Sequence, residues 1–266
     1  MPPGSAPLSE WKLQGSNLDV TAKLYGVDNT YSYWISDAGW YHIDPSGRTI
    51  RIPEGGDEII REHRLWGLPT LLCAMQRGDF FLHAAAVEVD RGAVLLAAPG
   101  RYGKTTLAMA FHREGHRVLS EDSACCRLTP SPVLLPGPAM LRIRPDMFDG
   151  HAPAGTHVVK VNEERIYLAL DKNRRGSDDP VPIRAIILLR ESANEIHLDR
   201  VTAQKSLPDL WALSFRLPND AARAQSFTQL TGLASRVPIW NLYRPLRVAR
   251  LSETVSKIVK MFPSVA

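Results

Sequence analysis

An apolar run, a loop with two glycines and a Lys-Thr pair follow one another in Ala93-Val-Leu-Leu-Ala-Ala-Pro-Gly-Arg-Tyr-Gly-Lys-Thr-Thr-Leu107. Residues 93–97 predict a short buried strand, and residues 106–113 predict a helix that ends at Gly115. The loop between them therefore has the strand–loop–helix setting of a phosphate-binding loop. In such a loop, backbone N–H groups point at phosphate oxygens and glycines allow close approach. The stretch predicts an α/β protein that binds the phosphates of a nucleotide.

Two side chains of this loop carry the charge and the hydroxyl that nucleotide binding requires. Lys104 is expected to contact the β- and γ-phosphates, and the Thr105 hydroxyl is expected to bind Mg²⁺. A similar string arises by chance in on the order of a few per cent of chains of this length, but here the flanking strand and helix favour function. The predicted nucleotide-binding residues are Ala98, Pro99, Gly100, Arg101, Tyr102, Gly103, Lys104, Thr105 and Thr106.

An acidic pair follows the next predicted strand, residues 117–119. Glu121 and Asp122 lie 17 and 18 residues after Lys104, a distance that accommodates one helix and one short strand. The pair is therefore expected at the end of a strand beside the loop. Phosphoryl transfer uses carboxylates there, one to hold Mg²⁺ and one to accept a hydroxyl proton. The alternative is an exposed acidic turn.

His83 lies in an apolar segment, residues 80–89, that predicts a single strand ahead of the loop. A histidine in such a strand is either a catalytic residue or a hydrogen-bonded core residue, and the sequence pattern alone leaves both open. Strands and helices alternate through the rest of the chain. Strands are predicted over residues 124–128, 140–143, 167–170 and 183–189, and helices over residues 203–215, 220–235 and 252–261.

The first 66 residues have a different character. Aromatic and β-branched residues predict strands over residues 31–35, 40–43 and 49–52, with a turn before the last. Helices are predicted over residues 58–66 and from Pro69 to residue 75. We therefore expect a small β-rich appendage at residues 1–66 and the larger nucleotide-binding domain at residues 67–266.

Composition restricts the classes of protein that fit. The chain has 266 residues, a net charge of +4 and 44% hydrophobic residues, which fits a globular protein and does not favour a nucleic-acid binder. The three cysteines, two of them adjacent, form no disulfide framework or metal-ligand pattern, which favours a cytoplasmic protein. Neither a signal peptide nor a membrane span is evident. Basic residues near the C-terminus predict a solvated face or a surface for an acidic partner: Arg236, Arg244, Arg247, Arg250, Lys257 and Lys260.

The segments around His83, the 97–107 loop and Gly115-His-Arg-Val-Leu-Ser-Glu-Asp122 together resemble the catalytic domain of HPr kinase/phosphorylase. They are still more similar to HPr-kinase-related proteins, which include lasso-peptide precursor kinases. The resemblance implies a phosphoenolpyruvate-carboxykinase-like, HPr-kinase-like core that uses ATP and Mg²⁺. It implies that Glu121 activates a serine hydroxyl, that Asp122 lies on the Mg²⁺ side with Thr105, and that His83 supports the acidic site.

The sequence departs from that family in two places. Glu121 stands where the family has aspartate, and the second, glycine-rich signature is not found; residues 135–142 occupy its place. Phosphorylase activity and HPr as the acceptor therefore do not follow from the resemblance. Additional phosphate contacts are considered for Arg142, Arg144, Lys160 and Arg190, each of which is otherwise a surface charge.

Three functions remain open at this point. The first is an ATP-dependent kinase that phosphorylates a serine-type hydroxyl of a peptide or protein, with residues 1–66 helping to bind this acceptor. The second is a kinase of a small-molecule hydroxyl, and the third is a nucleotide-sensing adaptor with little transfer activity. The sequence leaves the oligomeric state open, a homo-oligomer included.

Overall fold

The computed structural model describes residues 6–14, 19–171, 178–217 and 219–262, and the chain divides into two compact units. The N-terminal unit comprises Met1–Asp79 with Asn162–Glu164, and the C-terminal unit comprises Phe80–Val161 with Arg165–Ala266. The division follows Asp79, whereas the sequence suggested residue 66. The reason is that helix α2 (Leu68–Gln76) packs on strands β3, β4 and β5 of the N-terminal unit.

The N-terminal unit is built on a five-stranded antiparallel sheet in which the strands follow one another in chain order. Alternate residues point to opposite faces, so Leu24, Ile35 and Tyr41 are buried while Trp40 is exposed on the other face. Asp57 caps helix α1 by accepting a hydrogen bond from the Ile60 N–H. The elements are β1 (Ser9–Gln14), β2 (Asp19–Val27), β3 (Thr30–Ile35), β4 (Gly39–Ile43), β5 (Ile50–Arg51), α1 (Glu58–Leu65) and α2.

The C-terminal unit has a mixed sheet centred on β8 (Gly92–Ala97) and β15 (Val181–Glu191), which are parallel neighbours. Strand β15 pairs with three strands: β11 at its beginning, β8 in its middle and β17 at its end. The other strands are β6 (Phe80–Leu82), β7 (Ala84–Val89), β9 (Val118–Ser120), β10 (Ala124–Arg127), β11 (Val133–Leu135), β16 (His197–Val201) and β17 (Ile239–Arg244).

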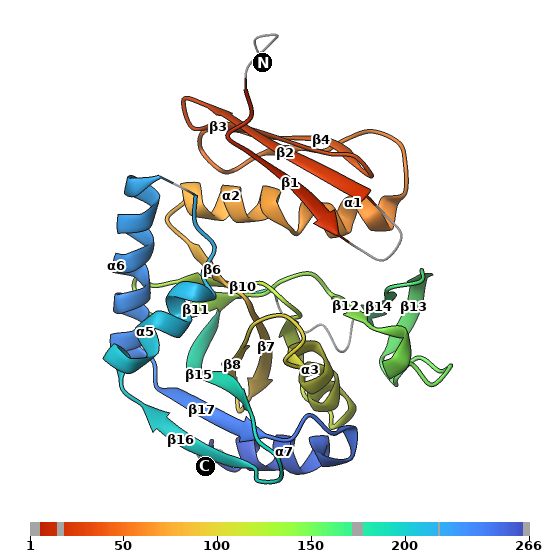
Figure 1. Cartoon of the computed structure of the whole chain (residues 1–266), viewed down its shortest axis with the longest axis vertical. Helices are drawn as coiled ribbons and strands as arrows, with labels where there is room; N and C mark the ends of the chain where they lie inside the picture. Colours follow the sequence, from red (N-terminus) through yellow and green to blue (C-terminus); the bar gives the residue numbers. More distant parts are fainter. Residues whose placement is uncertain (1–5, 15–18, 172–177, 218, 263–266) are drawn as a thin grey trace. The chain divides into compact units, whose positions relative to one another are not determined.

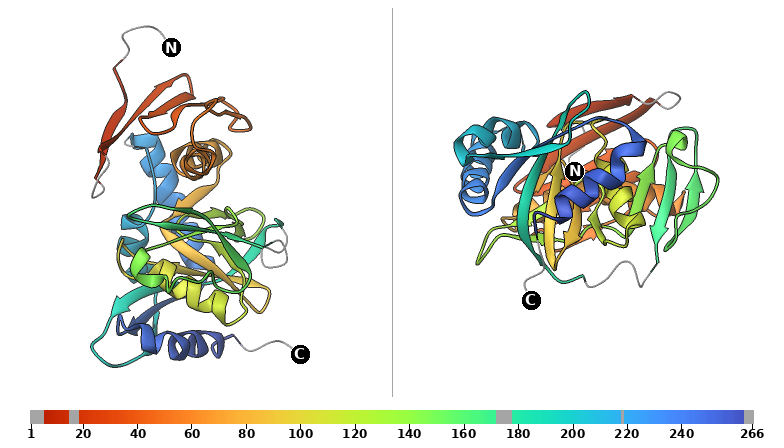
Figure 2. Two further views of the ribbon diagram at one scale, coloured as in Figure 1. Left: turned by 90° about the vertical axis from the view of Figure 1, so that its right-hand side faces the viewer. Right: turned by 90° about the horizontal axis from the view of Figure 1, so that it is seen from below.

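Helices cover both faces of this sheet, which is why β8 is apolar at every position. Val94 and Leu96 point into the core cluster that holds α3 (Lys104–Arg113) and α7 (Leu251–Val259). Leu95 points into the opposite cluster, with α5 (Ala203–Ala212) and α6 (Asp220–Arg236). The right-hand view of Figure 2 shows these helix pairs on either side of the sheet. The predicted mixed α/β class is confirmed.

A separate three-stranded antiparallel sheet lies next to α3 (Figure 1). Its strands are β12 (Met140–Ile143), β14 (Ile166–Leu170) and β13 (Thr156–Val161), in that order across the sheet. After β12 the chain turns through the short 3₁₀ helix η1 (Pro145–Met147). A second one, η2 (Val248–Arg250), precedes α7.

The single strand predicted over residues 80–89 is wrong at one residue, His83. The chain changes partners there: β6 pairs with β10, whereas β7 pairs with β8 and β9. At the change, the His83 N–H donates to the carbonyl of Leu213 at 2.7 Å instead of to a neighbouring strand. The apolar sequence gives no sign of this interruption, because residues on both sides of His83 are buried in the same way.

Candidate active site

The topology brings three segments to one edge of the mixed sheet. Strand β7 is antiparallel to both β8 and β9, so its beginning lies where β8 and β9 end. His83 immediately precedes β7, the 98–103 loop follows β8, and Glu121 and Asp122 follow β9. Residues that lie far apart in the sequence are therefore neighbours at this edge.

The 98–103 loop ends at Gly103, which has a left-handed backbone (φ 74°) and forms the N-cap of α3. Arg244, the last residue of β17, contacts this loop: its Nη2 donates a hydrogen bond to the Tyr102 carbonyl at 2.9 Å. A Cβ atom at Gly103 would lie 2.7 Å from this Nη2 and would displace the guanidinium, and the left-handed backbone independently favours glycine. The buried guanidinium of Arg244 thus holds the 98–103 loop in place.

Arg244 corrects one prediction made from the sequence. It was grouped with the basic residues of a solvated C-terminal face, but only 2% of it is exposed, and burial lowers the pKa of its guanidinium. The apolar run through residues 237–243 was the available signal of a buried strand leading to this arginine.

Lys104 is almost completely buried, with 5% of its surface exposed. Its Nζ donates to the carbonyls of Ala98 at 2.9 Å and Pro99 at 3.1 Å, and it lies 2.8 Å from His83 Nε2. Burial lowers the pKa of this lysine, and the nearby carboxylates of Asp122 and Glu121 oppose that shift. The ammonium group therefore lies at the base of the loop with acidic groups close to it.

His83 connects Lys104 to Asp122. An ammonium group can only donate, so Nε2 is the acceptor and the neutral ring carries its proton on Nδ1. Nδ1 lies 3.4 Å from Asp122 Oδ1, and Lys104 Nζ lies 3.8 Å from the same oxygen. Burial lowers the pKa of His83, although Asp122 opposes this effect, which favours the neutral ring at neutral pH.

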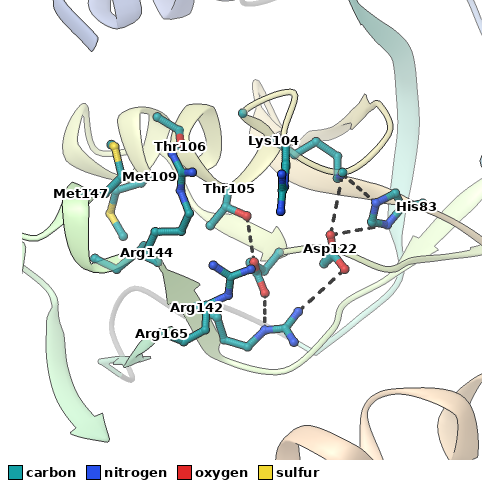
Figure 3. Close-up of a pocket in the computed structure, with 15 residues that line it drawn as sticks. His83, Lys104, Thr105, Thr106, Met109, Asp122, Arg142, Arg144, Met147 and Arg165 are labelled. Carbon is teal, nitrogen blue, oxygen red and sulfur yellow. Dashed lines mark hydrogen bonds and ion pairs between the residues drawn. The ribbon is translucent and has the colours of Figure 1, made fainter. Parts of the chain in front are cut away.

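Glu121 has a different set of partners. Its Oε1 accepts a hydrogen bond from Thr105 Oγ1 at 2.8 Å, and its Oε2 accepts one from Arg142 Nε at 2.7 Å. Burial alone would lower the pKa of Arg142, but Glu121 and Asp122 outweigh it and raise the pKa. As alternation at the end of a strand predicts, Asp122 lies next to His83 and Lys104 (Figure 3) whereas Glu121 bonds to Thr105, and Arg142 contacts both carboxylates.

These side chains line a cavity of about 300 Å³. The lining residues are His83, Gly100, Arg101, Gly103, Lys104, Thr105, Thr106, Met109, Glu121, Asp122, Arg142, Ile143, Arg144, Met147 and Arg165. Of the other residues predicted to bind nucleotide, Ala98 and Pro99 give their carbonyls to Lys104, and Tyr102 gives its carbonyl to Arg244.

Four arginine and lysine residues were considered for phosphate contacts, and the structure separates them. Arg142 and Arg144 line the cavity. Arg190 instead contacts Asp209 and Asn241 on another part of the sheet, and Lys160 lies on β13. Sequence reasoning missed Arg165, which β14 brings to the cavity through its pairing with β12.

The donors in this cavity fit Mg²⁺ by their chemistry. Thr105 offers a hydroxyl oxygen and the acidic pair offers carboxylate oxygens, which are the hard donors that Mg²⁺ prefers. In the described residues no group of three or more His, Cys, Asp or Glu side chains is placed to hold a metal ion. A magnesium ion here would thus depend on phosphate oxygens and water for its other ligands.

Comparisons with known proteins add little to this geometry. No protein-family model matches the chain, and no curated protein matches it. Among solved structures, the Hpr(Ser) kinase/phosphatase from Coxiella burnetii matches with a TM-score of 0.35 and 11% identity, over 69% of this chain and 99% of that chain. At this level of likeness neither fold nor function is transferred, and the lasso-peptide connection stays a prediction.

The structure also bears on membrane insertion. In the part of the chain that it describes, no helix is both long and apolar enough to cross a membrane.

Proposed function

We propose that this protein is a Mg²⁺- and ATP-dependent kinase with a P-loop core of the phosphoenolpyruvate-carboxykinase-like, HPr-kinase-like type. One observation carries the proposal: Lys104 and the Thr105–Glu121 pair lie at the start of α3 while the His83–Asp122 pair lies at the same edge of the sheet. Phosphoryl transfer requires these components together, namely a cation, a magnesium-side oxygen and a carboxylate that can take a proton.

The beginning of α3 and the loop before it would hold the phosphates. Free backbone N–H groups of a helix N-terminus attract anions, and Lys104 adds a full charge. In the structure Lys104 donates to two carbonyls of the loop, so nucleotide binding would exchange these contacts for contacts with the β- and γ-phosphates. Thr105 and Glu121 would hold Mg²⁺, which when bound neutralises charge on the phosphates.

Asp122 is the better candidate for the base. Both oxygens of Glu121 already accept hydrogen bonds, and only 7% of the residue is exposed. The Asp122 side chain is 35% exposed, so an acceptor hydroxyl can approach it. The family resemblance gave these roles to the opposite carboxylates, and the hydrogen bonds of Glu121 are the reason for exchanging them.

In the proposed reaction, Asp122 takes the proton of the acceptor hydroxyl as that oxygen bonds to the γ-phosphorus. The bond between this phosphorus and the bridging oxygen of ADP breaks, and its electron pair stays on ADP. His83 keeps Nδ1 3.4 Å from Asp122 Oδ1, so the ring would accompany the carboxylate as it takes up the proton. Arg142, whose Nη2 lies 3.8 Å from Asp122 Oδ2, places a positive charge on the other side of this carboxylate.

We propose a serine-type hydroxyl of a peptide or protein as the acceptor, bound with the help of the N-terminal unit. The open face of its sheet carries an aromatic group: Trp40 stacks on His42 with ring centroids 5.8 Å apart and contacts Tyr25 at 5.7 Å. Aromatic faces of this kind bind peptide side chains, and the edge strand β1 offers backbone groups to an extended segment.

The test is transfer of labelled phosphate from ATP to serine-containing peptides, compared with free serine, sugars and nucleosides. We expect label on peptide, and we expect Lys104→Ala to lower transfer by about 10²–10³-fold. The matched control is Lys260→Ala, which removes an exposed lysine that does not line the cavity. If label appeared only on a small molecule, the acceptor would be a small-molecule hydroxyl instead of a peptide or protein. Absence of any label with intact ATP binding would favour a nucleotide-sensing adaptor.

A further inference from the structure

The cavity has a second end that phosphoryl transfer does not use. Figure 3 shows His83 and Asp122 at one end of the cavity and Met109, Met147 and Arg144 at the other, with Thr105 and Thr106 between them. The first end is made of charged, hydrogen-bonded groups. The second end holds the thioethers of Met109, which is 3% exposed, and of half-buried Met147, together with the exposed Arg144.

Two elements bring these side chains together. Met109 follows Thr105 by four residues and Thr106 by three, so it lies on the same face of α3, one turn farther from the phosphate end. Met147 closes the η1 turn that follows β12. It packs against the core cluster that contains Met109 and Ile143. Met147 is thus held in place by the core while part of it stays open to the cavity.

The direction of a bound nucleotide follows from the phosphate end. Lys104 and Asp122 mark the position of the γ-phosphate, and the first turn of α3 continues towards Thr106. A triphosphate that enters in this orientation places its α-phosphate near Thr106, and the ribose and base must then lie beyond it. At that end of the cavity lie Met109, Arg144 and Met147 (Figure 3).

The chemistry of this wall suits a flat heteroaromatic ring. Thioethers are polarisable and adaptable, and they contact ring systems favourably. A guanidinium group stacks on aromatic faces, and Arg144 is exposed, with Asp146 3.1 Å from its Nη2. Among the described residues that line this end, no side chain is a carboxylate or an amide, and the Arg144 guanidinium already pairs with Asp146, so we expect stacking to contribute more than hydrogen bonds to the edge of the base.

We infer that Met109, Met147 and Arg144 form the nucleobase subsite, and that this subsite accepts purines by stacking with little discrimination between adenine and guanine. The inference rests on the proposed function, since it needs the triphosphate to lie at the start of α3. It adds which residues hold the base and how selective they are.

The experiment compares the binding of Mg-ATP, Mg-GTP and Mg-tripolyphosphate to the full chain by calorimetry. Tripolyphosphate retains the phosphates without base or ribose. We expect ATP and GTP to bind with affinities within about threefold of each other, and both to bind at least about tenfold more tightly than tripolyphosphate. Met147→Ala should weaken ATP and GTP binding by about three- to tenfold while tripolyphosphate binding stays unchanged.

The matched control is Met261→Ala, because Met261 is also a half-buried methionine packed on the same core cluster but does not line the cavity. Equal affinities for ATP and tripolyphosphate in the unmodified protein would overturn the subsite and leave the kinase proposal standing. A parallel loss of ATP and tripolyphosphate binding in Met147→Ala would overturn it too. Failure of all three ligands to bind would overturn both proposals.

Discussion

The two halves of the candidate active site hold one carboxylate each, and the two carboxylates differ in the length of their contacts and in their exposure. In the His83–Lys104–Asp122 half, contacts to the carboxylate are 3.4 and 3.8 Å long, Arg142 adds a third at 3.8 Å, and the side chain is open to the cavity. In the Thr105–Glu121–Arg142 half, the contacts are 2.8 and 2.7 Å long and the carboxylate is nearly covered. A loosely held, accessible carboxylate suits proton transfer, and a fixed one suits metal binding. Consecutive residues can thus acquire separate tasks from their partners alone.

The largest effect that would test this contrast is expected at Asp122. Asp122→Asn keeps the shape of the side chain and its place next to His83 but removes the basic oxygen, so transfer should fall by about 10²–10⁴-fold. Binding of Mg-ATP should change little. Steady-state transfer and calorimetric ATP binding measure the two quantities. If Asp122→Asn bound Mg-ATP poorly but still transferred phosphate at saturation, the two halves would have the opposite roles.

Glu121→Gln is the complementary change in the other half. The amide keeps a hydrogen bond with Thr105 but loses the negative charge next to the expected magnesium position. The concentration of Mg²⁺ required for half-maximal transfer should rise by about 10- to 100-fold, the usual cost of weakening a metal site. Transfer at saturating Mg²⁺ should fall much less than in Asp122→Asn. Thr105→Ala is a second test of the same half, since it should also raise the concentration of Mg²⁺ required for half-maximal transfer.

A smaller effect is expected at His83, and it depends on pH. Its pKa lies below the ordinary value of 6.5, chiefly because the ring is buried. As the pH falls, the unfolded chain therefore binds a proton at this histidine before the folded protein does. The contribution of the neutral ring to the free energy of unfolding is complete above about pH 6.5, and it is lost as the pH falls through the pKa of the folded state. Protonation of His83 Nε2 also removes the acceptor of the hydrogen bond from Lys104. Phosphoryl transfer should therefore decline as the pH falls through the pKa of His83 in the folded protein.

His83→Asn should remove that decline. The asparagine amide still donates towards Asp122 but carries no titratable ring, so transfer should fall roughly tenfold at neutral pH and lose its dependence on His83 protonation. The pH profile of transfer is the measurement, and the exposed residue His151, changed to Asn, is the control. An unchanged acidic decline in His83→Asn would assign the decline to another group.

The smallest effect is expected outside both halves, in the N-terminal unit. Trp40 is 40% exposed on the open face of the sheet, and we expect Trp40→Ala to raise the KM for a peptide acceptor by about three- to tenfold through loss of a stacking surface. The KM for ATP and kcat should be unchanged. Phe227→Ala removes an exposed aromatic ring from α6 and is the matched control. An unchanged acceptor KM in Trp40→Ala would place acceptor binding elsewhere.

Sequence reasoning recovers the parts of this site that are local. Residues 93–107 describe a strand, a loop and a helix within one continuous stretch, and β8 and α3 form where that pattern predicts them. The end of β9 before Glu121 is local in the same sense.

The parts that could not be predicted depend on pairings between distant segments. Arg142 reaches Glu121 only because β12 belongs to a sheet beside α3, and Arg244 reaches the loop because β17 pairs in parallel with β15. The partners of the two carboxylates depend on the orientation of single residues at the end of a strand, which a shift of one residue would exchange. The sequence carries no periodic signal for such a shift.

The pairing of β15 has a consequence for how the protein is made. A ribosome completes the 98–103 loop early, but the strand that lies beside β8 is residues 181–191, and the arginine that supports the loop is residue 244. At about 5–20 residues per second, the emerging chain carries the complete 98–103 loop for roughly 7–28 seconds before residue 244 is added. Under the proposed function, ATP would therefore meet a finished motif without a finished site, and its binding would assist folding only in the last stage.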